Sequence, residues 1–131
     1  FTEFNKQNVY IPGILLKTNM IISGKSAPDR ASAEKVAEMT VKCLKEHVPQ
    51  SIGGIVFLSG GQSDEEATEN LNAMNIVQGL PWRLTFSYGR AIQNLALIAW
   101  AKNSDDVTTA QQGLLDAAKR NSLASIGQYK F

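Results

Sequence analysis

The chain has 131 residues, 44% of them hydrophobic and 19% charged, and a formal net charge of +1. We therefore expect one globular domain with a single core, with no nucleic-acid partner and, since no apolar run approaches the roughly 20 residues of a spanning helix, no membrane insertion. Cys43 and His47 are single residues of their types, which excludes an intrachain disulfide and a Cys-rich or His-rich metal site and suits a cytoplasmic protein.

Apolar segments and helical patterns alternate along the chain. In chain order, we expect a strand at 14–17, a helix that begins at 33 behind the capping residue Ser32 and ends near Pro49, a strand at 55–58, a helix at 64–75, a strand at 82–86, a helix at 90–102 and a last helix after Asp105-Asp106. The strands look apolar on both faces, so this βαβαβαα order predicts an α/β fold with a parallel sheet.

Local patterns predict two helix starts and part of the core. Ser63 and Glu66 have the spacing of a capping box before the 64–75 helix. The 90–102 helix is apolar nearly all round, which predicts that it is well buried. Core positions are also predicted for Trp82, Trp100, Met39 and Met74.

Three parallel strands cannot close a barrel, and they would leave sheet edges and one face unprotected. The chain also begins with Phe1 rather than Met. Either partner subunits complete the sheet or the sequence is a piece of a longer protein, and we expect the second.

Lys17 follows the apolar residues Leu15 and Leu16 at the expected end of a strand. One interpretation is a lysine that extends to solvent from a strand end. The other is a nucleophile, because apolar walls from Leu15, Leu16 and the neighbouring strands would favour the neutral amine. Active sites of parallel α/β folds lie at the carboxyl ends of strands, so the second interpretation predicts Schiff-base chemistry.

Two small-residue turns follow the next strands. Ser59, Gly60 and Gly61 could form a plain strand-to-helix turn, or they could let a phosphate approach backbone N–H groups beside a helix N-terminus. Gln62 could line the same site mouth.

Ser87, Gly89 and Arg90 repeat this arrangement after the third strand. A cation in the first turn of a helix is unfavourable, so Arg90 is either a surface arginine or the partner of an anion such as phosphate.

Four segments carry a resemblance to a known family: residues 15–20 (LLKTNM), 57–63 (FLSGGQS), 71–75 (LNAMN) and 84–91 (LTFSYGRA). Together with residues 121–129 they closely resemble the C-terminal part of class I fructose-bisphosphate aldolase, in order and in spacing. The resemblance implies that residues 1–131 are the C-terminal portion of a single (β/α)8 TIM-barrel domain, its last three βα units plus the C-terminal helix.

The resemblance also implies an activity and a set of site residues. Such a lyase of glycolysis and gluconeogenesis cleaves fructose 1,6-bisphosphate reversibly to dihydroxyacetone phosphate and glyceraldehyde 3-phosphate, without a metal or other cofactor. Lys17 would form the imine, and Ser59, Gly60, Gly61, Ser87, Gly89 and Arg90 would bind substrate phosphate. The implied partners are the sugar phosphate, the rest of the barrel and further copies in a homotetramer.

Two other readings remain open on the sequence alone. Another lysine-dependent barrel enzyme such as transaldolase would act on a different sugar phosphate. A non-catalytic, aldolase-derived interaction module would need no complete active site, and the resemblance implies that the acid/base carboxylates lie outside these residues. We expect the 131-residue segment alone to be inactive.

Overall fold

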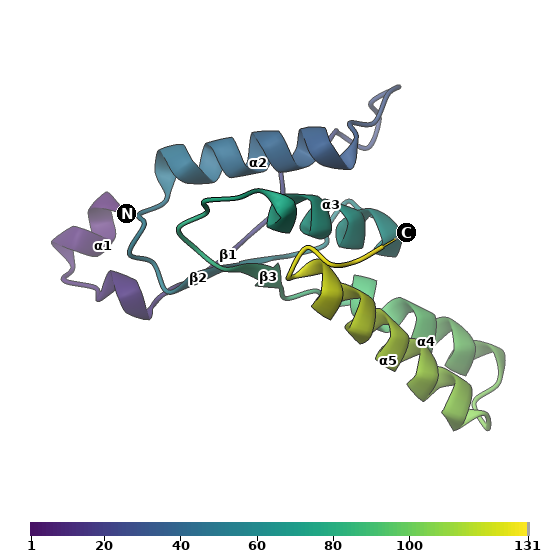
Figure 1. Ribbon diagram of the computed structural model, residues 1–131. Helices are drawn as coiled ribbons and strands as arrows, with labels where there is room; N and C mark the ends of the chain where they lie inside the picture. Colours follow the sequence, from purple (N-terminus) through teal and green to yellow (C-terminus); the bar gives the residue numbers. More distant parts are fainter. Residues whose placement is uncertain (131) are drawn as a thin grey trace.

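The computed structural model describes residues 1–130, in which helices and strands alternate (Figure 1). The elements are α1 (Thr2–Lys6), a 3-10 turn at Ile11–Gly13, β1 (Leu15–Thr18), α2 (Ala33–His47), β2 (Gly54–Phe57), α3 (Asp64–Ile76), β3 (Leu84–Phe86), α4 (Arg90–Lys102) and α5 (Val107–Ala124). Within these residues β1, β2 and β3 form one parallel sheet in that order. The predicted order of elements and the parallel sheet are confirmed.

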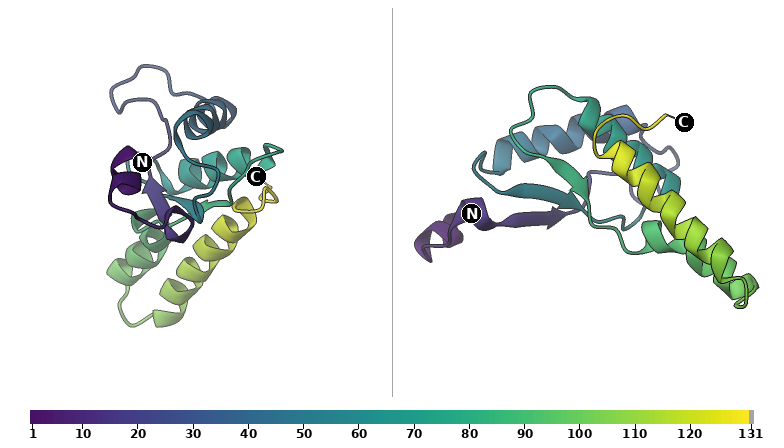
Figure 2. Two further views of the ribbon diagram at one scale, coloured as in Figure 1. Left: turned by 90° about the vertical axis from the view of Figure 1, so that its left-hand side faces the viewer. Right: turned by 60° about the horizontal axis from the view of Figure 1, so that its bottom comes forward.

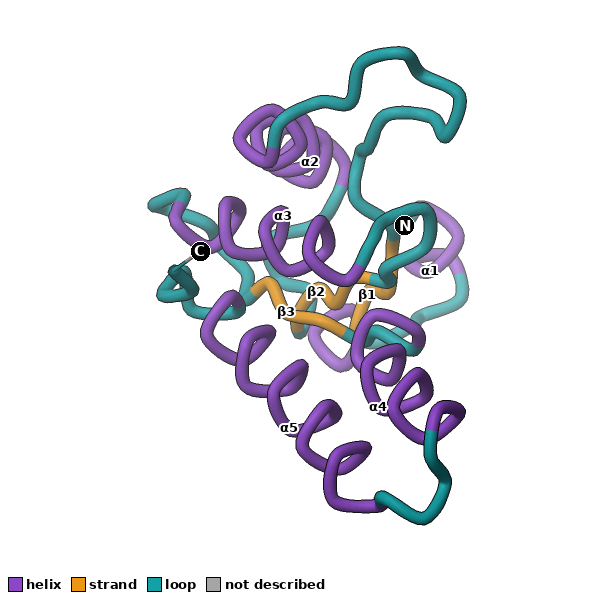
Figure 3. The backbone as a smooth tube through the Cα atoms, turned by 90° about the vertical axis from the view of Figure 1, so that its right-hand side faces the viewer, coloured by secondary structure: helices purple, strands orange, loops and turns teal. Residues whose placement is uncertain are grey.

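The sheet has one covered face and one open face. Leu16 pairs with Ile55, and Ile55 with Leu84, whereas Lys17 pairs with Val56, and Val56 with Thr85. Because successive side chains of a strand point to opposite faces, the two rows lie on different sides of the sheet. Helices α2 and α3 lie on one side of the sheet (Figure 3), and their buried residues cluster with Ile55 and Leu84 of the first row.

The prediction that the strands are buried on both faces is therefore wrong for the described residues. Ile55 and Phe57 are fully buried, but Leu15, in the row of Lys17, is 66% exposed. The physical reason is that no described element packs on the second face, so an apolar residue there remains accessible. Successive apolar residues of one strand, such as Leu15 and Leu16, therefore lie in different environments: one on the open face, the other against the core.

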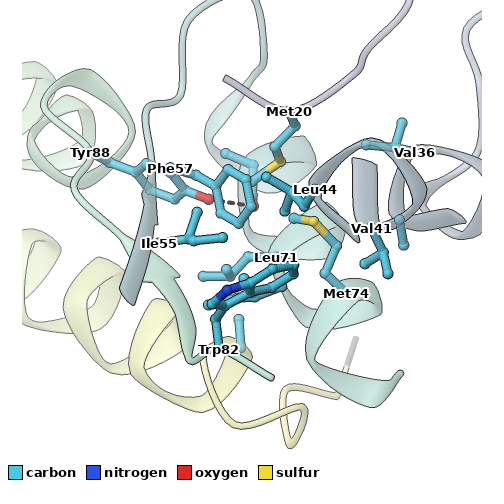
Figure 4. Packing of buried hydrophobic residues seen from close by; sticks show 14 of the residues in the cluster. Met20, Val36, Val41, Leu44, Ile55, Phe57, Leu71, Met74, Trp82 and Tyr88 are labelled. Atoms are coloured by element: carbon cyan, nitrogen blue, oxygen red, sulfur yellow. Dashed lines mark hydrogen bonds between the residues drawn. The ribbon is translucent and has the colours of Figure 1, made fainter. Parts of the chain in front are cut away.

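The core lies between the covered face and the two helices (Figure 4). Met74 and Leu71 of α3 are fully buried, and Trp82 is 7% exposed. The Trp82 indole N–H donates to the Pro49 carbonyl at 2.8 Å, which satisfies the polar end of this large side chain. The core predictions for Trp82 and Met74 are confirmed.

Helices α4 and α5 lie side by side and project away from the sheet (Figure 2). The prediction that α4 is well buried is wrong for this chain: Ala91 is its one buried residue, and Ile98 and Trp100 are 58% and 56% exposed. The reason is that β3 is an edge strand among residues 1–130, so α4 has only α5 and α3 to cover it. Met39, also predicted for the core, is 36% exposed on α2.

The helix starts follow the predicted capping chemistry. The Ser63 hydroxyl accepts from Glu66 N–H at 3.1 Å, and the Ser63 N–H donates to the Glu66 carboxylate at 2.8 Å, so the capping box is confirmed. Ser32 caps α2 in the simpler way, by accepting from Lys35 N–H. No helix in residues 1–130 combines the length and apolarity needed to cross a membrane.

We expect Leu71→Ala to lower the free energy of unfolding by about 2–5 kcal/mol, because it leaves a cavity at a fully buried position. Ile76→Ala on the same helix is the matched control. Its side chain is 56% exposed, and we expect a change within about 0.5 kcal/mol. Urea denaturation of both variants checks this, and equal losses would contradict the assignment of α3's buried side.

Candidate active site

Lys17 is the third residue of β1 and lies on the open face of the sheet. Its ammonium donates to the Ser87 hydroxyl at 3.1 Å. Ser87 follows β3 directly, and its N–H donates to the Phe57 carbonyl at 2.8 Å, which continues the β2–β3 pairing one residue further. The side chain of Lys17 therefore extends over the sheet toward its carboxyl edge and is accessible from the open face. Leu16 lies on the other face and does not line the surroundings of Lys17.

The loop at residues 59–63, between β2 and α3, forms a tight turn at this edge. Gln62 N–H donates to the Ser59 carbonyl at 3.2 Å, and Gly61 has φ of +83°. Glycine suits this backbone conformation because a Cβ is disfavoured there. A Cβ on Gly61 would also lie 3.1 Å from Cδ1 of Ile22. The 59–63 loop is thus closely packed against the segment that follows β1.

A cleft of about 590 Å³ joins the 59–63 loop to α4. Ser59, Gly61 and Gln62 line one side, and Arg90 lines the other. The other lining residues are Lys25, Ser63, Asp64, Glu65, Asn94, Leu95 and Ile98. The structure therefore brings three of the predicted phosphate-binding residues to one cleft.

The other predicted residues lie beside this cleft. Ser87 contacts Lys17, Gly60 is inside the 59–63 loop, and Gly89 is the N-cap residue of α4. The Gly89 carbonyl accepts from the N–H groups of Ile92 and Gln93, so it begins the helix without a side-chain cap. Arg90 is consequently the first helical residue, and its side chain is exposed.

Tyr88 fixes the position of the turn between Ser87 and Arg90. Its ring is buried, and its hydroxyl donates to the Ala67 carbonyl of α3 at 2.9 Å. Burial raises the pKa of Tyr88 well above its usual range, so the phenol stays neutral and remains a donor. With Tyr88 inward, the residues on either side of it remain exposed at the cleft edge.

Sequence reasoning missed two residues that contact the 59–63 loop. Asn19 donates to the Gly60 carbonyl at 3.4 Å, and Arg30 donates to the Gly61 carbonyl at 3.3 Å. Both lie in the connection between β1 and α2. Asn19 lies in the 15–20 segment (LLKTNM), where no role was predicted for it. Arg30 lies in a polar loop that has no helical or strand spacing to indicate a role. In residues 1–130 no group of three or more His, Cys, Asp or Glu side chains is placed to hold a metal ion.

Known proteins are similar to this chain over nearly its whole length. The model of the class-I fructose-bisphosphate aldolase family matches residues 1–131. A probable fructose-bisphosphate aldolase class 1 from Xanthomonas axonopodis pv. citri is 51% identical over 99% of this chain, which spans 39% of that relative. The chloroplastic fructose-bisphosphate aldolase 1 of Arabidopsis thaliana is 50% identical over 98% of the chain and 32% of its own length.

A solved structure agrees with the sequence relatives. The fructose-bisphosphate aldolase of Plasmodium falciparum, crystallised with TRAP and a small-molecule inhibitor, superposes with a TM-score of 0.94 at 43% identity. It covers 100% of this chain, and the match takes in 38% of the Plasmodium chain. The α/β fold described above therefore corresponds to part of an aldolase, and the chain belongs to the class-I fructose-bisphosphate aldolase family.

Proposed function

We propose that residues 1–131 are the C-terminal portion of a single (β/α)8 barrel domain, comprising its last three βα units and the C-terminal helix. The complete enzyme cleaves fructose 1,6-bisphosphate reversibly to dihydroxyacetone phosphate and glyceraldehyde 3-phosphate. Family membership and the parallel sheet support this proposal. Family membership also favours it over the transaldolase alternative.

The single observation that carries the proposal is the position of Lys17. Its amine lies on the open sheet face, 3.1 Å from the Ser87 hydroxyl and beside the turns that hold Ser59, Gly61 and Arg90. This face has no described cover, so a substrate carbonyl can approach the amine. Parallel barrels build their active sites at this edge.

The chemistry follows from a primary amine at that place. The Lys17 amine adds to the substrate ketone, and loss of water gives a protonated imine. The imine accepts the electron pair of the C3–C4 bond as that bond breaks, which releases the aldehyde and leaves an enamine. Protonation of the enamine carbon and hydrolysis of the imine then release dihydroxyacetone phosphate and restore the amine. No metal or other cofactor is required, and proton transfer is assigned to acid/base groups in the rest of the barrel.

The turns at the two strand ends would hold the phosphate. Arg90 supplies a cation at the cleft, and the backbone of Ser59, Gly60 and Gly61 supplies N–H donors, as anion sites at strand-to-helix turns commonly do. Ser87 and Gly89 complete the second turn. The substrate thus spans from Lys17 to the cleft.

The remainder of the barrel is the first partner of this chain. Exposed Leu15 on the open face and exposed Leu97 and Trp100 on α4 would then be covered by it. We further propose a homotetramer in the cytoplasm, although the Arabidopsis relative is chloroplastic.

Lys17 is expected to carry the covalent adduct in the complete enzyme. Borohydride added with dihydroxyacetone phosphate should reduce the imine at Lys17, and peptide mass mapping should locate it there. Lys17→Met should abolish cleavage and leave the fold unchanged, since the side chain lies on the surface. Lys42→Met is the matched control, because Lys42 is an exposed lysine on α2 and does not line the cleft. An adduct on Lys25, Lys42 or Lys45 would refute the assignment.

Arg90→Ala should weaken phosphate binding by about 1.5–3 kcal/mol, the range for a hydrogen bond to a charged group. Competitive inhibition by inorganic phosphate measures it directly. Arg83→Ala serves as control, because Arg83 is an exposed arginine that lines a different pocket near the start of β3. Equal inhibition constants in the two variants would exclude Arg90 from the phosphate site.

Residues 1–131 produced alone should not cleave fructose 1,6-bisphosphate, because Lys17 would lack acid/base partners. They should also self-associate through the uncovered sheet edge and face. Size-exclusion chromatography with a cleavage assay tests both points. An active, monodisperse monomer would show that a complete site exists within these residues.

A further inference from the structure

We propose that Arg30 is a positioning residue for the phosphate site: it turns the Gly61 carbonyl away from the substrate phosphate and neutralises Glu66 beside it. This inference rests on the proposed phosphate-binding role of the 59–63 loop. Arg30 itself does not line the cleft that contains Arg90. Its effect would therefore pass through the loop.

Arg30 forms a three-point contact between two segments. Its Nε donates to Glu66 Oε1 at 2.7 Å, and its Nη2 donates both to Glu66 Oε2 and to the Gly61 carbonyl at 3.3 Å. The same Glu66 oxygen Oε2 accepts from Ser63 N–H at 2.8 Å. Arg30, the capping box and the loop carbonyl thus form one connected group around the start of α3.

The orientation of two peptide groups follows from these bonds. Asn19 holds the Gly60 carbonyl and Arg30 holds the Gly61 carbonyl. In a trans peptide the N–H points opposite to the C=O. The N–H groups of Gly61 and Gln62 must therefore point away from Asn19 and Arg30. Gln62 N–H closes the turn onto Ser59, and Gly61 N–H donates no hydrogen bond within residues 1–130 and remains for an anion.

Local charge gives a second reason to assign this positioning role to Arg30. The first turn of α3 carries Asp64, Glu65 and Glu66, a helix-stabilising arrangement that would repel a phosphate at the preceding loop. Arg30 contacts both oxygens of Glu66, and the two side chains are only 39% and 36% exposed. An ion pair that solvent reaches adds little to stability. The main effect of the Arg30–Glu66 pair is therefore on the local charge that an approaching anion meets.

The contact requires the shape of arginine. Two guanidinium nitrogens serve the two carboxylate oxygens while one of them also reaches the Gly61 carbonyl. A lysine ammonium is a single point donor and cannot reproduce this planar fork. Arg30→Lys should therefore restore the charge without the full geometry.

The test compares Arg30→Ala with Lys35→Ala in the complete enzyme. Lys35 forms an exposed ion pair with Glu38 on α2 and does not contact the loop. We expect Arg30→Ala to raise the KM for fructose 1,6-bisphosphate and the inhibition constant of inorganic phosphate roughly tenfold, with kcat changed less than about twofold. Arg30→Lys should recover part of this loss, and Lys35→Ala should match the parent. Unchanged phosphate inhibition in Arg30→Ala would overturn the proposal.

A double variant separates positioning from direct contact with phosphate. Glu66→Gln removes the carboxylate charge but keeps a side chain suited to the capping box. If Arg30 acts by neutralising Glu66, adding Glu66→Gln to Arg30→Ala should recover part of the phosphate affinity. No recovery at all would overturn this role.

The cleavage assay and a phosphate titration distinguish failure of this inference from failure of the proposed function. A parent protein that does not cleave the bisphosphate overturns the proposed function, and calorimetric titration with inorganic phosphate still tests Arg30. Weaker phosphate binding by Arg30→Ala in that titration supports the inference. Equal binding, or no phosphate binding by the parent protein, overturns it.

Discussion

The parallel register of the three described strands is the constraint on which the site depends. It aligns Lys17 with Val56 and Thr85 and places Leu16 with Ile55 on the other side. Hydrophobic burial against α2 and α3 stabilises the row that contains Leu16 and Ile55. A slip of one residue in β1 would exchange the two faces, moving the lysine into the core and Leu16 onto the open face. The burial of Ile55 and Leu16 therefore orients the amine as well as stabilising the sheet.

Helix α3 holds both turns of the candidate site in place, the 59–63 loop and the turn after β3. Its inner side is anchored in the core by Leu71 and Met74, and its first turn is joined to the 59–63 loop by the Ser63–Glu66 capping box. Its Ala67 carbonyl accepts from the Tyr88 hydroxyl, which ties the turn after β3 to the same helix. The two turns are consequently held relative to each other by one buried element, and flexibility in one would disturb the other.

The sequence predicted the elements because their signals are local. Hydrophobic spacing, the capping box at Ser63 and the turn residues each act within a few positions, and α4 begins and ends where its pattern predicted. The burial of α4 was not predictable in the same way. An apolar helix is buried only if something covers it, and coverage depends on elements elsewhere in the fold. Exposed Trp100 is the clearest example.

The same distinction applies to the site. The roles of Lys17 and of the six phosphate residues were inferred from the residue patterns and from the resemblance, and they stay predictions. The proximity of Lys17 to Ser87, and of Ser59 and Gly61 to Arg90, is a structural finding. Seventy positions separate Lys17 from Ser87, a distance at which no local pattern operates. Parallel topology brings them together because Lys17 lies near the carboxyl end of β1 and Ser87 follows the carboxyl end of β3, at the same edge of the sheet.

The cleft also combines the acidic first turn of α3 with the exposed Arg90. Stabilising the N-terminus of α3 calls for carboxylates, and binding a phosphate there calls for the opposite charge. Two of the three carboxylates in the first turn of α3 accept hydrogen bonds: Glu66 from Arg30, and Asp64 from the Asn94 amide of α4 at 3.0 Å. Hydrogen-bonded carboxylates remain at the helix start while Arg90 stays exposed at the cleft. Under the proposed function, helix stability and anion binding would share one helix end, where the charges of Asp64 and Glu66 are each offset by a hydrogen-bond donor.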